Sequence, residues 1–209
     1  MKKQLAPRLN SPAKPGAKPG RPHAPPGEVR IIGGLYKRTK LAVPDKPGLR
    51  PTPDRVRETL FNWLGQDLSG WHCVDPFAGT GALGLEAASR GAASVLMGEQ
   101  DADLVLRLKA LQLKLGAAAV KVERTDGVAL LRRLAPASQQ LILLDPPFES
   151  ALFAPALEAA ARAVAEPGFI FLEAPEPWGE ERLAPLGLAP YRQGKAGMVH
   201  FHLVVRRPA

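Results

Sequence analysis

Several features that would define a protein class are missing from this sequence of 209 residues. Cys73 is the single cysteine, which excludes a framework of disulfide bonds and a zinc site built from cysteines. No run of about 18 apolar residues occurs, so no membrane-spanning helix is predicted. The first residues also lack the apolar stretch of a signal peptide. We therefore expect a soluble cytoplasmic protein with no metal and no membrane partner.

Acidic residues are scarce in the first part of the chain. Residues 1–57 hold 14 lysines and arginines and only 3 acidic residues, whereas residues 58–209 hold 14 and 17. Residues 1–27 contain seven prolines, no acidic residue and few apolar ones, which predicts a disordered basic tail. Basic segments commonly bind the phosphates of nucleic acids, and a tail that only increases solubility is the alternative.

The next segment, residues 28–50, is predicted to form an N-terminal arm. Apolar residues precede Gly33 and Gly34, and a stretch that mixes apolar with basic residues follows, which suits a short hairpin or an extended arm. Lys37 and Arg38 lie in this stretch and are candidates for contacts with RNA phosphates. We expect residues 51–209 to form one domain.

A helix is predicted to begin the domain. Thr52 suits a helix N-cap and Pro53 suits the first helical position, and the apolar residues that follow recur at helical spacing. Arg55 and Arg57 fall off this apolar stripe, so we expect them to point away from it. Together with Arg50 they are candidates for binding phosphates. Ion pairs on a solvated helix face are an equally supported alternative.

From residue 71 onward, strand and helix patterns alternate. Predicted strands cover residues 72–75, 94–98, 120–124, 140–144 and 169–173, and predicted helices cover 81–90, 101–115, 127–134 and 151–165. This rhythm indicates an α/β protein with a mostly parallel, doubly wound sheet and helices on both faces. A β-rich segment at 198–205 and a weaker strand at 186–191, linked by 193–197, suit an antiparallel pair at the edge of the sheet.

A glycine-rich turn follows the first of these strands. Residues 74–81 are Val-Asp-Pro-Phe-Ala-Gly-Thr-Gly, in which the strand ends at Asp75 and Ala78, Gly79, Thr80 and Gly81 form the turn. Its glycines allow a ligand to approach the backbone closely. Such a turn also binds the pyrophosphate of NAD, but a carboxylate beside it would repel that group. S-adenosylmethionine carries a sulfonium and an ammonium group instead, so the aspartate favours it as the cofactor.

Two more strand ends carry acidic residues. Glu99 lies 18 residues after Gly81, where an acid accepts hydrogen bonds from ribose hydroxyls. Asp126 ends the third strand, where it suits the adenine amino group while the backbone N–H of Gly127 suits a ring nitrogen. Each acid also suits a cap for the helix that follows. Three strand ends that each carry an acid favour a cofactor site.

The most specific motif is Asp-Pro-Pro-Phe at residues 145–148, after a fully apolar strand. Its prolines stiffen the corner and remove two N–H donors, which leaves the Asp145 carboxylate and the Pro146 carbonyl as acceptors. Two acceptors can hold both hydrogens of an exocyclic amine and direct its lone pair at a methyl group, while Phe148 stacks on the base. The motif predicts methyl transfer to a nucleobase nitrogen, with Asp145, Pro146, Pro147 and Phe148 as catalytic residues. A proline-rich surface turn is the alternative.

Taken in order, these motifs resemble the RsmD-type methyltransferases. The matching runs are Arg-Ile-Ile-Gly-Gly at 30–34, Gly-Leu-Arg-Pro-Thr-Pro-Asp-Arg-Val-Arg-Glu-Thr-Leu-Phe-Asn-Trp-Leu at 48–64, Asp-Pro-Phe-Ala-Gly-Thr-Gly-Ala-Leu-Gly-Leu-Glu-Ala at 75–87 and Asp-Pro-Pro-Phe at 145–148. The resemblance covers roughly residues 29–205. It implies a class I methyltransferase fold, which is Rossmann-like, with a seven-stranded sheet and an antiparallel final strand. It also implies S-adenosylmethionine as donor and S-adenosylhomocysteine as product.

The resemblance implies a bacterial enzyme that methylates the N2 amine of guanine 966 in 16S ribosomal RNA, within an assembling 30S particle. We expect a monomer. The resemblance also assigns the cofactor to Asp75, Ala78, Gly79, Gly81, Glu99 and Asp126, and the target base to residues 145–148. Two alternatives stay open. One is an adenine-N6 methyltransferase that acts on DNA or RNA, because the Asp-Pro-Pro corner suits that amine too. The other is a non-catalytic RNA-binding assembly factor with the same fold.

Overall fold

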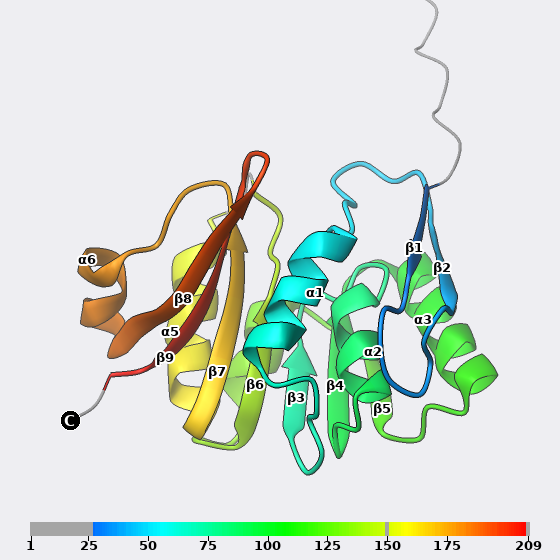
Figure 1. Ribbon diagram of the computed structural model, residues 1–209, viewed down its shortest axis with the longest axis horizontal. Coiled ribbons are helices and arrows are strands. Elements are labelled where there is room, and N and C mark those ends of the chain that lie inside the picture. The colour runs from blue at the N-terminus through cyan, green and yellow to red at the C-terminus, as the bar shows by residue number, and fades with distance from the viewer. Residues whose placement is uncertain (1–26, 149–150, 208–209) are drawn as a thin grey trace, which may run out of the picture.

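The chain folds as a hairpin followed by alternating strands and helices (Figure 1). The computed structural model describes residues 27–148 and 151–207, so the predicted tail lies outside the described residues except for Gly27. The elements in chain order are β1 (Gly27–Arg30), β2 (Lys40–Val43), α1 (Asp54–Trp63), β3 (His72–Asp75), α2 (Ala82–Ser89), β4 (Ser94–Glu99), α3 (Ala102–Leu115), β5 (Val120–Arg124), α4 (Gly127–Arg133), β6 (Gln139–Leu144), α5 (Phe153–Ala163), β7 (Val164–Ala174), α6 (Glu180–Leu183), the 3-10 helix η1 (Ala184–Leu186), β8 (Leu188–Ala196) and β9 (Val199–Arg206).

The predicted α/β sheet is confirmed. Seven strands follow the order β5-β4-β3-β6-β7-β9-β8, and the first five are parallel. β9 runs antiparallel to both of its neighbours. The strand order reverses at β3, which pairs with β4 on one side and with β6 on the other. Open α/β sheets bind ligands beside the carboxyl ends of the strands at such a reversal.

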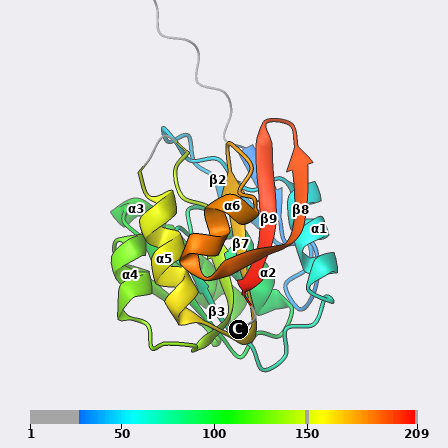
Figure 2. The same ribbon diagram turned by 90° about the vertical axis from the view of Figure 1, so that its left-hand side faces the viewer.

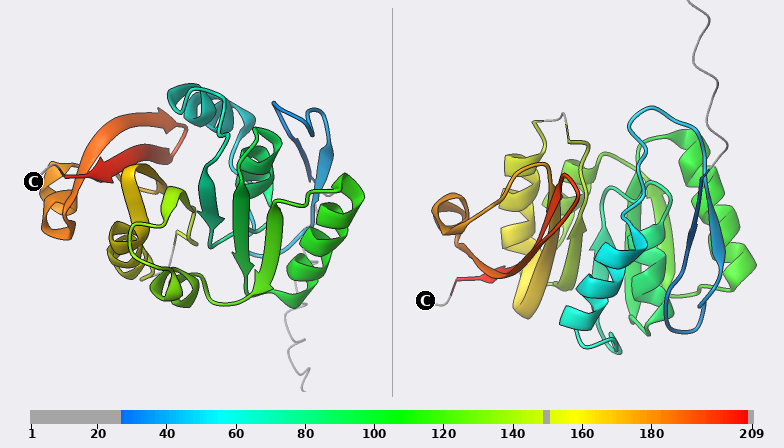
Figure 3. Two further views of the ribbon diagram at one scale, coloured as in Figure 1. Left: turned by 90° about the horizontal axis from the view of Figure 1, so that it is seen from below. Right: turned by 45° about the horizontal axis from the view of Figure 1, so that its top comes forward.

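Helices cover both faces of the sheet (Figure 3). The β1–β2 hairpin, α1, α2 and α3 pack on one face, and α4, α5 and α6 pack on the other. In β6, Leu141 and Leu143 face the first group, whereas Ile142 and Leu144 face the second. All four leucine and isoleucine side chains are completely buried, as expected for a central parallel strand. Among the described helices, none is long and apolar enough to cross a membrane.

The predicted bounds of the C-terminal antiparallel pair are wrong. β8 continues through residues 193–196, which had suggested a link, and the turn follows at Gly197, where φ is +60°. Gly194 lies inside this strand, and a Cβ added there would meet the Phe201 ring at 2.3 Å. The glycine therefore permits close strand packing instead of ending the strand. Figure 2 shows the resulting long hairpin at the edge of the sheet.

Candidate active site

Three acidic side chains share one face of the sheet at the carboxyl ends of its central strands. Asp75 ends β3, Asp145 follows β6, and Glu173 lies near the end of the neighbouring strand β7. Because side chains alternate between the two faces of a strand, all three point to the side on which Leu143 and Phe171 pack, which α1 and α2 cover. The carboxylates of Asp75 and Asp145 therefore lie at the same end and on the same face of the sheet.

These carboxylates line a single cleft of about 960 Å³. Its wall includes the loop of residues 46–52, which passes over the upper edge of the sheet between β2 and α1 (Figure 1). Pockets of roughly 300–1,000 Å³ hold drug-sized ligands, so this one has room for a nucleoside-sized cofactor and a base. The predicted residues that line it are Asp75, Ala78, Gly79, Thr80, Glu99, Gly127, Arg50, Asp145, Pro146, Pro147 and Phe148.

Asp75 is buried at the floor of the cleft. Its side chain is 1% exposed, and its Oδ2 accepts a hydrogen bond of 2.9 Å from the backbone N–H of Gly84. Burial raises the pKa of Asp75 to about 7; the Gly84 hydrogen bond opposes this shift and the charge of Glu99 adds to it. A positive ligand charge in the cleft would favour the ionised form.

Glu99 accepts hydrogen bonds from two loops, the glycine-rich turn after β3 and the loop after β4. Its Oε2 accepts a hydrogen bond of 2.9 Å from the N–H of Gly79, and its Oε1 accepts one of 2.8 Å from the N–H of Asp101. Gly81, with φ of +82°, is the N-cap of α2, and a Cβ there would meet Leu108 at 2.6 Å. The glycine-rich turn is thus held in a shape that only small residues permit.

Asp126 acts as the helix cap that the sequence left open as an alternative. Its Oδ1 accepts a hydrogen bond of 2.8 Å from the N–H of Ala129, and its Oδ2 accepts one of 2.8 Å from Gln100. Gly127 and Gln100 line the cleft. A contact between Asp126 and an adenine amino group stays a prediction, and Gln100 was not predicted.

The Asp-Pro-Pro-Phe corner borders the other half of the cleft. Pro146 is buried, whereas Phe148 is half-buried. Removal of Asp145 from water raises its pKa well above the ordinary value, and the charges of Glu173 and Asp75 raise it further. A hydrogen bond from Thr52 and the charge of Arg50 oppose this shift. The carboxyl group is therefore a stronger proton acceptor than an ordinary aspartate.

The expected cap of α1 is wrong, and the correction adds a residue to the site. The helix begins at Asp54 with Pro53 as its N-cap, and no side chain caps it. The hydroxyl of Thr52 instead lies 3.4 Å from Oδ2 of Asp145, to which it donates. The nearby Thr52 hydroxyl also lowers the pKa of Glu173. A residue that suits a cap thus lies beside two carboxyl groups of the cleft.

Glu173 was not among the predicted site residues. It is 3% exposed and lines the cleft. Burial raises its pKa to about 7, while the Thr52 hydroxyl and the charges of Arg50 and Arg57 oppose the shift. The signal for it was present in the sequence, because Glu173 ends the apolar run of a predicted strand, as Asp75 and Glu99 do.

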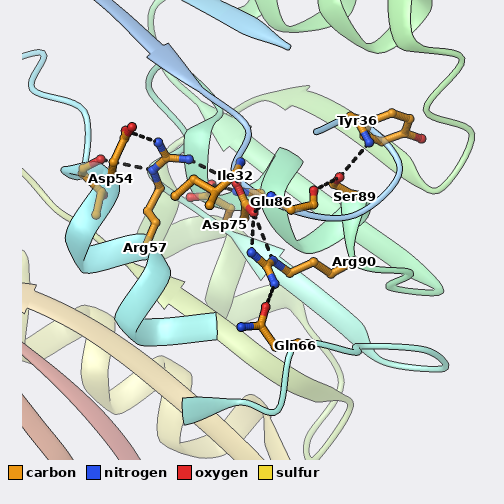
Figure 4. A network of polar contacts seen from close by, with 12 residues as sticks. Ile32, Tyr36, Asp54, Arg57, Gln66, Asp75, Glu86, Ser89 and Arg90 are labelled. Carbon is orange, nitrogen blue, oxygen red and sulfur yellow. Dashed lines mark hydrogen bonds and ion pairs between the residues drawn. The ribbon is translucent and has the colours of Figure 1, made fainter. Parts of the chain in front are cut away.

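Arg57 does not point away from the core, and its predicted contact with phosphates must be withdrawn. The side chain is completely buried (Figure 4). It donates to Glu86 Oε2 at 3.2 Å, to Asp54 Oδ1 at 2.6 Å and to the backbone carbonyl of Thr52 at 3.3 Å. The prediction from apolar periodicity that Arg57 points away from the core was wrong, because a charged side chain can be buried when a charged partner is buried with it.

Glu86 is the centre of this polar network (Figure 4). Its side chain is completely buried and accepts a hydrogen bond of 2.7 Å from Arg90. It also accepts hydrogen bonds of 2.8 Å from the backbone N–H groups of Ile32 and Gly33 in the arm. The network therefore joins the arm, α1 and α2, and through Arg57 it holds the Thr52 backbone at the edge of the cleft.

The remaining predicted basic residues differ in how far they lie from the cleft. Arg50 is exposed and lines it, and Arg55 is exposed on the first turn of α1. Lys37 and Arg38 are exposed in the arm turn that packs on Ser89, at the far end of α2. That end is about 12 Å from the glycine-rich turn, because α2 has eight residues. Contacts of these four residues with RNA stay predictions.

The chain is similar to known proteins over most of its length. A family model described as Conserved hypothetical protein 95 matches residues 29–205. Ribosomal RNA small subunit methyltransferase D of Escherichia coli strain K12 is 37% identical over 186 residues, which are 88% of this chain and 93% of the relative. The protein of the same name from Haemophilus influenzae is 45% identical over 127 residues, which are 58% of this chain and 65% of the relative.

Solved structures support the same relationship. YhhF from Escherichia coli has a TM-score of 0.73 and 35% identity, covering 88% of this chain and all of that one. The 16S rRNA N2 methyltransferase RsmC of Thermus thermophilus, solved with AdoMet and guanosine, has a TM-score of 0.63 and 21% identity over 88% of this chain and 50% of that one. This second likeness supports the class I methyltransferase fold alone. From the family match and the relatives together, the chain belongs to the RsmD family, whose model is described as Conserved hypothetical protein 95.

Proposed function

We propose that this protein transfers a methyl group from S-adenosylmethionine to the exocyclic N2 amine of a guanine in small-subunit ribosomal RNA. The observation that carries the proposal is that Asp75 and the Asp145 corner line the same cleft. The name of the relatives supports methyl transfer to ribosomal RNA. Guanine 966 as the target and an assembling 30S particle as the substrate are the finer parts of the proposal.

The charge of the cleft favours a cationic donor. Three acidic side chains with raised pKa values, those of Asp75, Asp145 and Glu173, face it. Lys46 also lines the cleft, but its Nζ is paired with Asp101 at 2.7 Å. S-adenosylmethionine, when bound, supplies a positively charged sulfonium that carries the methyl group. Neutralising buried carboxylates is favourable, so this donor fits better than an anionic dinucleotide.

The residues of the glycine-rich half would hold the donor. We assign the cationic end to the side of Asp75 and the ribose hydroxyls to Glu99. The lone pairs of Glu99 that its two backbone contacts leave are available for this. The backbone N–H of Gly127 suits a ring nitrogen of adenine, and Asp126 suits its amino group. A Cβ at Gly127 would meet the carbonyl of Pro76 at 2.5 Å, so the loop is already closely packed there.

The Asp145 corner would act on the guanine amine. The Asp145 carboxylate and the Pro146 carbonyl each accept one N2–H, which orients the nitrogen lone pair toward the methyl group. When the N–C bond forms, one N2–H proton must leave, and the raised pKa of Asp145 suits it as the acceptor. Phe148 would stack on the base after it has left its RNA stack. Arg50 and Arg55, both exposed, are proposed to contact neighbouring phosphates.

The test is to identify the methylated base. Small subunits that lack the modification are incubated with the protein and methyl-labelled S-adenosylmethionine, and the RNA is then digested to nucleosides. We expect labelled N2-methylguanosine, mapped to position 966, with no label incorporated by Asp145→Ala. Labelled N6-methyladenosine would establish the adenine alternative. An absence of label together with no calorimetric affinity for the donor would establish a non-catalytic factor.

A further inference from the structure

A buried acidic residue borders the predicted amine site but has no part in the proposed methyl transfer. Glu173 is 3% exposed and lies on the strand next to the one that Asp145 follows, near the Thr52 hydroxyl that donates to Asp145. Its Oε1 is buried and has no hydrogen-bond partner anywhere in the described ranges 27–148 and 151–207. Because Glu173 lines the cleft, a bound ligand is able to supply the missing partner.

In the part of the chain that the structure describes, the neighbours of Glu173 leave its Oε1 without a donor. The Thr52 hydroxyl donates its one proton to Asp145, Asp145 is itself acidic, and Phe201, which lies opposite on β9, is apolar. Arg50 and Arg57 influence Glu173 through their charges. A buried polar atom without a partner destabilises the folded protein. A ligand N–H group at this position would remove that destabilisation.

The two candidate bases differ at the position beside the reacting amine. Guanine has an N1–H donor next to its N2 amine, whereas adenine has a lone pair on N1 next to its N6 amine. We infer that Glu173 accepts a hydrogen bond from the N1–H of the target guanine and so excludes adenine from the pocket. This inference rests on the proposed function and adds a specificity residue to it.

The two carboxyl groups accept different hydrogen bonds because of their positions in the sheet. Asp145 begins the stiff proline corner and takes the amine, while Glu173, on the neighbouring strand, takes the adjacent ring N–H. Above about pH 7, where Glu173 is ionised, adenine held by its amine would direct the N1 lone pair at an acidic oxygen and leave that oxygen without a donor. Sites built to hydrogen-bond a substrate N–H reject analogues without it by large factors.

The experiment compares two bases that carry the same amine. Small-subunit RNA is prepared with guanine or with 2-aminopurine at the methylated position; 2-aminopurine keeps the exocyclic amine but has a lone pair at N1. We expect the wild-type kcat/KM to favour guanine by about 100-fold or more. In Glu173→Gln the side-chain amide can accept from the N1–H of guanine or donate to N1 of 2-aminopurine, so we expect the preference to fall at least tenfold, mainly through gain with 2-aminopurine.

A matched control separates this role from a general effect of removing an acid. Glu176→Gln changes an exposed acid three residues further along, which pairs with Arg182 at 2.7 Å, and should keep the wild-type preference. Thermal unfolding and donor affinity measured on Glu173→Gln establish that the variant is folded. If it does not fold, equal wild-type kcat/KM for the two bases would still overturn the role of Glu173.

The outcomes distinguish this inference from the proposed function. Equal kcat/KM of the wild type for both bases, or an unchanged preference in folded Glu173→Gln, would overturn the role of Glu173 while N2-methylguanosine remained the product. A wild-type product other than N2-methylguanosine would overturn the proposed function, and the role of Glu173 would be lost with it.

Discussion

Replacing Asp75 by asparagine should stabilise the protein in the absence of cofactor and weaken cofactor binding. Asp75 is 1% exposed, and its pKa is raised from 3.8 to about 7, chiefly by burial. Each pKa unit corresponds to about 1.4 kcal/mol, so ionising this carboxyl group in the folded state costs about 4 kcal/mol relative to the unfolded state. Asparagine removes the charge and keeps an oxygen that can accept the hydrogen bond from Gly84.

The direction of the pH dependence follows from titration in both states. Below pH 3.8 the carboxyl group is protonated in the folded and the unfolded protein, and its full contribution to stability is present. Between pH 3.8 and about 7 only the unfolded state loses the proton, so the free energy of unfolding decreases as the pH rises. Between pH 5 and pH 8 this one group should lower it by about 3 kcal/mol. Asp75→Asn should lack that component.

Urea unfolding at pH 5 and pH 8 without cofactor measures the difference. Other titrating groups contribute to both proteins, so the comparison of wild type with Asp75→Asn isolates Asp75. Asp67→Asn is the control, because hydrogen bonds from Ser69 lower the pKa of Asp67 and its titration ends below this range. Calorimetry at pH 8 should show at least tenfold weaker donor binding by Asp75→Asn. Parallel pH dependence in the two proteins, or unchanged donor affinity, would refute the reasoning.

Three further predictions concern the network, the arm and the pH dependence of transfer. Arg57→Met should lower the free energy of unfolding by about 2 kcal/mol, because it removes one of the two arginines that pair with the buried Glu86 carboxylate. Arg55→Met, on the same helix but exposed, should change it by under about 0.5 kcal/mol in urea titrations; equal effects would contradict the network. Gly34→Ala should lower the free energy of unfolding by about 2 kcal/mol or more, because its Cβ would meet a backbone oxygen of α2 at 1.8 Å. Gly48→Ala, at a similar φ but with open space, should lower it by about 1 kcal/mol. Calorimetric melting that ranks the two variants the other way would count against this packing. Because burial raises the pKa of Asp145 well above 3.8, kcat/KM should begin to fall well above pH 3.8 as the pH is lowered, and a profile that stays flat down to about pH 4 would contradict a proton acceptor of raised pKa.

The sequence was sufficient to predict the framework of the site. The strand-ending acids Asp75, Glu99 and Asp145 and the glycine-rich turn were located correctly, because a strand that ends at an acid is a local signal. The parallel sheet then brings those ends to one edge whatever the details of packing. Glu173 also lies at the end of a predicted strand, so the same local signal was sufficient to predict it as a site residue.

What sequence periodicity could not give is the network around Glu86. Arg57 is one residue from an apolar helix position. Its burial is favourable only because the arm and α2 pack against α1 and bring Glu86 within hydrogen-bond distance. Thr52 illustrates the same limit, because its cap-like sequence competes with a carboxyl group 93 residues away. Local patterns describe what a residue suits, and tertiary contacts decide which partner it takes.

The central claim is that one cleft holds a methyl donor beside Asp75 and an amine beside Asp145. The most direct measurement is single-turnover methyl transfer by Asp145→Asn, together with calorimetry of donor binding to the same preparation. We expect donor affinity within about twofold of wild type, because Asp145 lies outside the glycine-rich half, and a transfer rate at least 100-fold lower, a loss typical of a missing general base. Transfer at a near wild-type rate, or a loss of donor binding equal to the loss of transfer, would contradict this division of the cleft.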